Sequence, residues 1–276
     1  MDERHLDATK KVTEIRALIG GDISALRQAI ANAELALEFR AADEMIGLSP
    51  VEPASLDALR EATGEARRSL IDRGDVDTAI EVARRGIRGL EDDATIEKAA
   101  ALLAAEEGSA EAIHQLALLS FHGVGRPEDK VRCYELQQRA AGMGHAGALF
   151  ELYAMTAQGL GCDQDMDRAV AYCIEAAEAG NVRAMANVAG FFATGNGVVR
   201  DVEQSLAWYG RAAEHGHGRA ATVLGIMYAN GDDLPASAAD ARRWFDRAEA
   251  LAFPWKDLAL DCGVDLAALG YDDPDC

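Results

Sequence analysis

The sequence predicts an all-α protein built as a solenoid, in which short helical hairpins stack one upon another. From Ser109 onwards, the same residue types recur every 36 residues, and a fixed period in this range is typical of stacked supersecondary units. Within a period, apolar residues such as Met185 and Val188 follow helical spacing until a glycine, here Gly195. This pattern indicates a helix that ends in a turn.

The repeats are defined by equivalent positions in successive blocks. The blocks begin at Ser109, His145, Asn181 and His217. The glycines in the middle of each block are Gly123, Gly159, Gly195 and Gly231, and the closing glycines are Gly108, Gly144, Gly180 and Gly216. Two sets of alanines recur, Ala112, Ala148, Ala184 and Ala220, then Ala140, Ala176, Ala212 and Ala248. The second half of each block has Asp129, Asp165, Asp201 or Ser237, followed by Leu136, Tyr172, Trp208 or Trp244. So many coincidences exclude chance.

Each recurring position has a physical role. A glycine ends the first helix because a left-handed backbone conformation costs other residues more. Asp201 with Gln204 resembles a capping pair for the second helix, and Asp165 and Ser237 suit the same position. The alanines allow neighbouring helices to approach closely. One hairpin cannot bury its apolar face alone, so the blocks are expected to stack.

These landmarks resemble the Sel-one-like repeat (SLR), a relative of the tetratricopeptide repeat, whose signature is approximately A-x3-LG-x2-Y-x2-G-x-GV-x2-D-x2-KA-x2-WY-x-KAA-x2-G. Residues 220–231 (AATVLGIMYANG) and 195–216 (GNGVVRDVEQSLAWYGRAAEHG) match it nearly throughout. The first block departs at Arg126-Pro127, and the fourth departs at Asp232-Asp233 and at Ala252. The resemblance implies a right-handed superhelix whose first helices line a concave groove for peptides or partner proteins.

The repeat register predicts the organisation of the chain. Four Sel-one-like repeats occupy 109–252, and a degenerate repeat is expected at 73–108. Residues 1–72 are expected to form a separate N-terminal helical region of three helices, punctuated at Gly20-Gly21 and near Gly47. Residues 253–276 continue the register as a C-terminal capping helix, with YDDPDC as a frayed tail.

Composition excludes several classes of partner. The formal net charge is -20 and no basic stripe compensates it, so nucleic acid is not expected to bind. No stretch approaches the roughly 18 apolar residues of a membrane span, and the N-terminus does not resemble a signal peptide. The five cysteines form no CxxC pair, which favours reduced thiols and a cytoplasmic protein.

A search for catalytic or metal-binding constellations finds none. His114 and His122 lack a third ligand, and His145 and His217 occupy equivalent inter-repeat turns, which favours a structural role over a metal site. Cys173 is interpreted as a small buried residue, like Cys133. The Gly-x-Gly turns lack the strand and the Lys-Ser/Thr of a phosphate loop. The sequence therefore predicts no enzyme, no catalytic residue, no metal and no cofactor.

The resemblance maps the groove onto the first helices. The candidate partner-binding residues are Glu111, His114, Phe150, Glu151, Arg183, Asn187, Arg219 and Thr222. Arg183 and Arg219 could clamp an acidic or C-terminal peptide segment, with Asn187 pairing to its backbone. The simpler interpretation, which the sequence favours, is that both arginines pair with neighbouring acidic residues.

The predicted function is a non-catalytic interaction scaffold or adaptor, bacterial and cytoplasmic, that binds a protein or peptide. The alternative is an immunity protein that neutralises a bacterial toxin, with an acidic groove covering a basic surface. Both a monomer and a homodimer are compatible with the sequence, because solenoid ends expose apolar faces unless they are capped.

Overall fold

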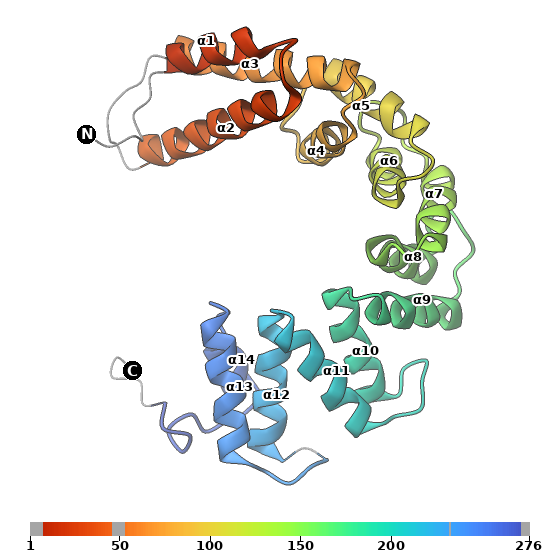
Figure 1. Ribbon diagram of the computed structural model, residues 1–276. Helices are drawn as coiled ribbons and strands as arrows, with labels where there is room; N and C mark the ends of the chain where they lie inside the picture. The colour runs from red at the N-terminus through yellow and green to blue at the C-terminus, as the bar shows by residue number, and fades with distance from the viewer. Residues whose placement is uncertain (1–7, 46–52, 232, 272–276) are drawn as a thin grey trace. The chain divides into compact units, whose positions relative to one another are not determined.

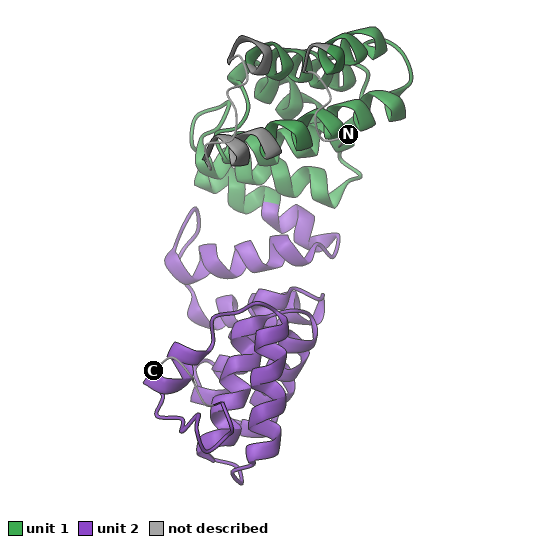
Figure 2. Ribbon diagram, turned by 90° about the vertical axis from the view of Figure 1, so that its left-hand side faces the viewer, with its two compact units in different colours: residues 1–136 green, residues 137–276 purple. Residues whose placement is uncertain are grey.

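The computed structural model describes residues 8–45, 53–231 and 233–271, and these residues form fourteen helices and no strand (Figure 1). The predicted all-α class is therefore confirmed. The chain divides into two compact units, residues 1–136 and 137–276 (Figure 2). The division falls inside helix α7 (Lys130–Gly142), so it does not follow the boundaries of the sequence repeats.

Unit 1 contains the N-terminal helices and the first half-repeats. Its helices are α1 (Ala8–Leu18), α2 (Ile23–Met45), α3 (Pro53–Asp72), α4 (Val76–Ile87), α5 (Asp93–Ala105) and α6 (Ala110–His122). Helices α1 to α3 enclose their own apolar core, in which Ile15, Leu26, Leu59 and Leu70 are buried. Helices α4 and α5 lie in the segment interpreted as a degenerate repeat. The expected break near Gly47 lies outside the described residues.

Unit 2 contains an alternating series of helices. They are α8 (Ala146–Gln158), α9 (Met166–Glu178), α10 (Val182–Thr194), α11 (Val202–Glu214), α12 (Gly218–Asn230), α13 (Ala238–Ala250) and α14 (Lys256–Asp261). We call α8, α10 and α12 the first helices and α9, α11 and α13 the second helices. Each first helix packs against the second helix of its own repeat (Figure 1).

The recurring alanines lie where the helices approach one another most closely. In unit 2 the alanines of both sets are buried, and larger side chains fill the spaces between them. Met185, Val188, Leu224 and Phe245 belong to one continuous apolar core. At Gly225 an added Cβ would lie 2.5 Å from the Phe245 ring, so the helices could not hold this separation with a larger residue.

Glycine ends α6 and each of the first helices of unit 2. Gly123, Gly159, Gly195 and Gly231 are all left-handed, with φ between 65° and 76°. The second helices of unit 2 begin, as predicted, at Asp165, Asp201 and Ser237, whose side chains accept a hydrogen bond from the backbone three residues on. These caps satisfy backbone N–H groups that the helix leaves without a partner.

The residue that opens each repeat caps its first helix. The four capping residues are Ser109, His145, Asn181 and His217. In the two histidines the Nδ1 atom accepts from the backbone N–H of Ala148 at 3.0 Å and of Ala220 at 3.1 Å. The structural role predicted for the histidines is thereby confirmed, because each ring accepts a bond from the first turn of its own helix.

The fourth repeat replaces two glycines with residues that carry a side chain. Ala252 closes the repeat with φ 52°, and Asp233 occupies its mid-block turn with φ 60°. The Asp233 carboxylate forms an ion pair with Arg200 of the preceding repeat. Ala252 has no such compensating contact, and its N–H donates to the Glu249 carbonyl at 2.8 Å in the manner of the closing glycines.

Residues 253–271 cover the end of the last repeat. Trp255 stacks on Phe245 with 4.4 Å between ring centroids, and Tyr271 meets Trp255 edge-on at 4.9 Å. The Tyr271 hydroxyl donates to Asp246 at 2.5 Å. The expectation that the tail frays from Tyr271 is therefore wrong, because this side chain completes the aromatic cluster. Residues 272–276 lie outside the described part of the chain.

Replacing Ala252 with glycine is expected to stabilise the protein by about 0.5–1 kcal/mol, since glycine adopts positive φ without steric cost. The matched change, Gly216→Ala, introduces the same strain at the equivalent position and should lower stability by about 1 kcal/mol. A Cβ at Gly216 would touch nothing within 4 Å, so backbone conformation alone is tested. Urea unfolding of both variants measures the effect, and an Ala252→Gly protein no more stable than the parent would contradict it.

His217 is expected to make stability depend on pH. Burial lowers its pKa below the usual value, with nearby Arg219 acting in the same direction. A base whose folded pKa is depressed contributes stability above its unfolded pKa of about 6.5, and this is lost as pH falls through and below that value. His217→Asn keeps a capping residue that Asn181 shows to be suitable.

Between pH 7.5 and 5 the parent should therefore lose more unfolding free energy than His217→Asn, and denaturant titrations at the two pH values give the comparison. His217→Ala, which removes the cap, should be less stable by about 1 kcal/mol at pH 7.5. Equal losses in the parent and the asparagine variant would show that the histidine does not titrate within its cap.

Candidate partner-binding site

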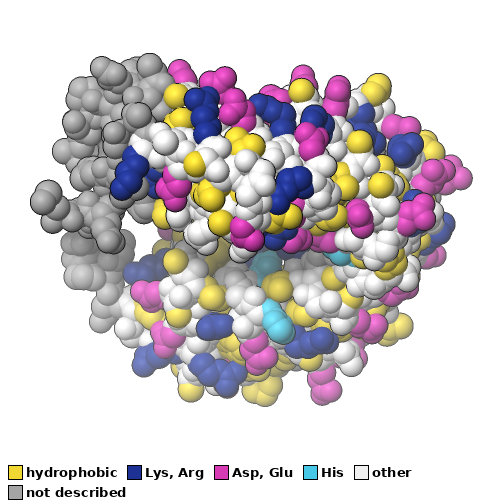
Figure 3. Space-filling view, turned by 45° about the horizontal axis from the view of Figure 1, so that its top comes forward, with side chains coloured by type: hydrophobic (Ala, Val, Ile, Leu, Met, Phe, Trp, Pro, Cys, Tyr) yellow, Lys and Arg dark blue, Asp and Glu magenta, His cyan; other side chains and the backbone are white. Residues whose placement is uncertain are grey.

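The first helices of unit 2 carry very little charge. Each has a single charged residue, Glu151 in α8, Arg183 in α10 and Arg219 in α12. Each second helix carries several charged residues. On the face of the molecule drawn in Figure 3, basic and acidic side chains are interspersed. In a chain of net charge -20, the first helices thus form a surface whose local charge is slightly positive.

Arg183 and Arg219 are exposed at equivalent positions of the third and fourth repeats. The Arg183 guanidinium lies over the Phe150 ring, 4.4 Å from its centroid, which is a cation–π contact. Within the described residues, neither arginine comes within ion-pairing distance of a carboxylate. The pairing with neighbouring acids that the sequence favoured is not what the structure shows.

Asn187 lies one helical turn beyond Arg183 and near a buried cysteine. The Cys173 thiol donates to the Ala184 carbonyl at 3.8 Å, and the Asn187 side chain is near enough to act on the pKa of this thiol. Burial raises the pKa of Cys173 to about 12, although the Asn187 contact acts in the opposite direction. Asn187 is half-buried, so part of this residue is accessible one helical turn from Arg183.

Aromatic side chains continue the surface from the buried Phe150. Tyr153 lies 5.7 Å from Phe150 and 6.1 Å from Phe191, measured between ring centroids. Tyr209 reaches the same region from a second helix, since a Cβ added at Gly190 would lie 3.7 Å from its hydroxyl. Burial raises the pKa of Tyr209 while Arg219 acts to lower it, which places this hydroxyl in the field of that arginine.

Sequence reasoning did not include Tyr209, because its position belongs to the second helix of the repeat. The signal that could have identified it is the absence of a side chain at Gly190. A glycine on an exposed helical face leaves backbone uncovered, so a residue from the neighbouring helix can reach across it.

The other predicted site residues are not all accessible. Thr222 is fully buried and its hydroxyl donates to the Gly218 carbonyl at 3.1 Å. His114 is also buried, and Glu111 bonds to Arg84 at 2.8 Å and to Gln115 at 2.7 Å. Glu111 and His114 belong to unit 1, whereas Phe150 and the residues after it belong to unit 2. The structure brings together Phe150, Arg183 and Asn187, with Arg219 on the next first helix.

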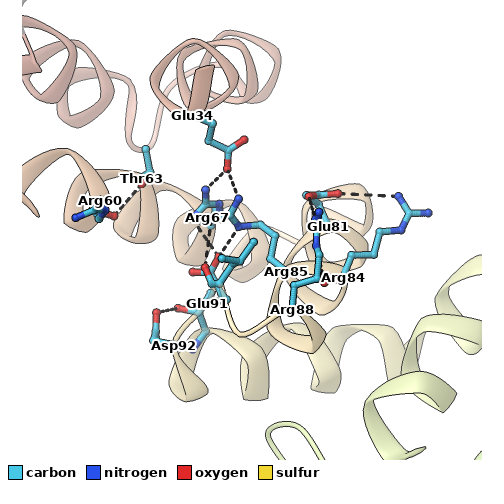
Figure 4. A network of polar contacts seen from close by, with 12 residues as sticks. Glu34, Arg60, Thr63, Arg67, Glu81, Arg84, Arg85, Arg88, Glu91 and Asp92 are labelled. Atoms are coloured by element: carbon cyan, nitrogen blue, oxygen red, sulfur yellow. Dashed lines mark hydrogen bonds and ion pairs between the residues drawn. The ribbon is translucent and has the colours of Figure 1, made fainter. Parts of the chain in front are cut away.

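Unit 1 contains a largely buried network of ion pairs that joins helices α2, α3 and α4 (Figure 4). Arg67 of α3 lies between Glu34 of α2 and Glu91, which follows α4, with 3.1 Å between Arg67 Nη1 and Glu91 Oε2. Arg85 of α4 contacts the same two carboxylates, each at 3.1 Å. A pocket of about 660 Å³ beside the network is lined by these residues, and because their charges are mutually satisfied, the network is a structural element.

The described residues contain no group of three or more His, Cys, Asp or Glu side chains placed to hold a metal ion. Nor does any helix among them have both the length and the apolar character needed to cross a bilayer.

Comparison with known proteins identifies the repeats. Sel1 repeats match residues 110–145, 152–181, 182–217 and 218–252. The short stretch 146–151 lies outside the matches, and it contains Phe150 and Glu151. No curated protein sequence matches this chain.

Several solved structures have a similar fold. A Sel1 repeat protein from Oxalobacter formigenes is 27% identical with a TM-score of 0.56, over 68% of this chain and 79% of that one. The protective antigen c5321 of uropathogenic Escherichia coli, which displays an SLR fold, is 17% identical with a TM-score of 0.54, over 88% and 54%. The immunity protein Pa5087 from Pseudomonas aeruginosa is 17% identical with a TM-score of 0.45, over 78% and 80%.

Cys173 is expected to resist alkylation in the folded protein, since its thiol is buried and its raised pKa leaves almost no thiolate at neutral pH. Cys262 is exposed and should react readily. Maleimide labelling at pH 7.5, read by peptide mass spectrometry, compares the two positions. Labelling in guanidinium chloride should make both react. Equal labelling of Cys173 and Cys262 without denaturant would show that the Cys173 thiol is not buried as described.

Proposed function

The chain is a Sel1-repeat protein, and we propose that it acts as a non-catalytic scaffold that binds a protein segment on the first helices of unit 2. The observation that carries this proposal is the pair of exposed arginines, Arg183 and Arg219, on a surface with almost no other charge. Such a surface combines apolar and aromatic area with a few placed polar groups, which is the usual composition of a recognition site.

The chemistry of these side chains favours a partner segment that bears carboxylates. An arginine guanidinium offers a planar set of donors that fits a carboxylate with two hydrogen bonds. Arg183 is already stacked on Phe150, so less of its conformational freedom is lost when a ligand binds. Asn187, one turn away and half-buried, can pair with the backbone of the same segment.

Catalysis is not part of the proposal because the candidate groups are engaged otherwise. His145 and His217 accept backbone hydrogen bonds at helix N-termini, and Cys173 has a pKa too high for a nucleophile at neutral pH. We further propose that the scaffold acts in the bacterial cytoplasm, where its free cysteines would remain reduced.

The alternative function, an immunity protein, requires an acidic groove that covers a basic toxin. The first helices of unit 2 do not offer an acidic surface, since their charged residues are one glutamate and two arginines. The likeness to the Pseudomonas immunity protein is too weak to weigh against this. The charge of the surface thus favours the scaffold with an acidic partner.

Reversing both charges, Arg183→Glu with Arg219→Glu, is expected to weaken partner binding by about 100-fold or more, because carboxylates of the partner would then face carboxylates. The matched control is Arg211→Glu with Arg243→Glu, which alters two arginines that also stack on aromatic rings but lie on second helices. The measurement is affinity capture from native lysate with the parent, the variant and the control as baits, quantified by mass spectrometry.

A protein retained by the parent and by the control, but lost from the first-helix variant, would establish the site. Titration of that protein with the same three baits then gives the change in Kd. Retention of one partner by all three baits would place binding elsewhere on the chain. Identification of a toxin among the retained proteins would restore the immunity function.

A further inference from the structure

The turn between α6 and α7 in unit 1 departs from the other repeats at one position. There the other three repeats carry an apolar residue, namely Cys162, Val198 and Leu234. The first repeat carries Arg126 instead. Arg126 and Leu234 are both followed by a proline, which restricts the preceding residue to extended conformations. The first and fourth repeats therefore share a residue-proline pair at this position, but the residue is a charged arginine in the first repeat and an apolar leucine in the fourth.

The Arg126 side chain is partly buried without a partner. Its Nε is inaccessible to solvent and has no hydrogen-bond acceptor, and no ion pair or hydrogen bond joins its side chain to any other described residue. Burial, and then the neighbouring Arg132, lower the pKa of the guanidinium. A buried donor without an acceptor, and a desolvated cation without a counter-charge, are both destabilising.

The nearest carboxylates in the sequence are engaged elsewhere. Glu128 forms an ion pair with Lys130 at 3.0 Å. Asp129 caps α7, where its Oδ1 accepts from the backbone N–H of Arg132 at 2.9 Å. Neither carboxylate forms an ion pair with Arg126 of the turn or with Arg132 in the first turn of α7, although acids outnumber bases in the chain as a whole.

We propose that the α6–α7 turn binds an oxyanion, a carboxylate or a phosphate group, through Arg126 with Arg132 as the second cation. An oxyanion supplies the acceptor that Arg126 Nε lacks and the negative charge that the pair of guanidinium groups lacks. Binding here would not depend on the first helices of unit 2. The competing interpretation is that the aliphatic part of Arg126 fills the apolar position while its charged end is simply hydrated.

Thermal unfolding in phosphate and in acetate, each against chloride at matched ionic strength and pH 7.5, separates the two interpretations. The key variant is Arg126→Leu, which reproduces the Leu-Pro sequence of the fourth repeat. At an anion concentration about ten times its Kd, the parent midpoint should rise roughly 2–4 °C more than that of the variant. Phosphate also stabilises proteins without binding, so only this difference between proteins is interpreted.

Two further variants complete the test. Arg132→Gln, at an exposed residue, should lose part of the anion effect and also keeps the test valid if Arg126→Leu does not fold. Arg243→Gln, at an exposed arginine of unit 2, should respond like the parent. A response to both anions indicates general oxyanion recognition, and a response to one identifies its class. An equal rise in midpoint for all four proteins in both anions would overturn the proposal.

Discussion

The left-handed residue that closes each repeat, together with the capping residue directly after it, determines the geometry on which the rest of unit 2 depends. At Gly180 the backbone turns at φ 95°, and Asn181 then caps α10 through Ala184. Gly216 and His217 do the same for α12. Because one conformation recurs at these junctions, equivalent positions of α10 and α12 fall at equivalent places on the surface. Arg183 and Arg219, each two residues after a capping residue, are thereby presented alike.

The same position serves different purposes along the chain. In the first repeat it is Glu111, which bonds to Arg84 of α4 and so belongs to the packing of unit 1. In the second it is Gly147, which has no side chain. In the third, Arg183 stacks on that ring. The recurring glycines and alanines keep the helices in the same arrangement in each repeat. The residues at a few variable positions can then differ in the contacts they make.

The repeat period predicted the helix boundaries well, because helix caps and left-handed glycines depend on residues close together in the sequence. Asp165, Asp201 and Ser237 were assigned as caps from the sequence, and they are. The exposure of the candidate groove residues was harder to predict from the sequence. His114, Phe150 and Thr222 occupy one equivalent position, five residues after the capping residue, and all three are buried. That position is rotated towards the core by roughly 70° about the helix axis relative to the mean direction of Arg183, Asn187 and Gly190.

The contacts of Arg183 could not be predicted because they depend on a neighbouring repeat. Pairing with an acid was the reasonable expectation in a chain with 47 acidic and 27 basic residues. In unit 1 the arginines do form ion pairs, since Arg67 and Arg85 each contact both Glu34 and Glu91. The first helices of unit 2 contain no aspartate and one glutamate. Arg183 therefore contacts an aromatic ring, that of Phe150, instead of a carboxylate. A ring attracts a cation without neutralising it, and the positive charge of this surface therefore remains available to a partner.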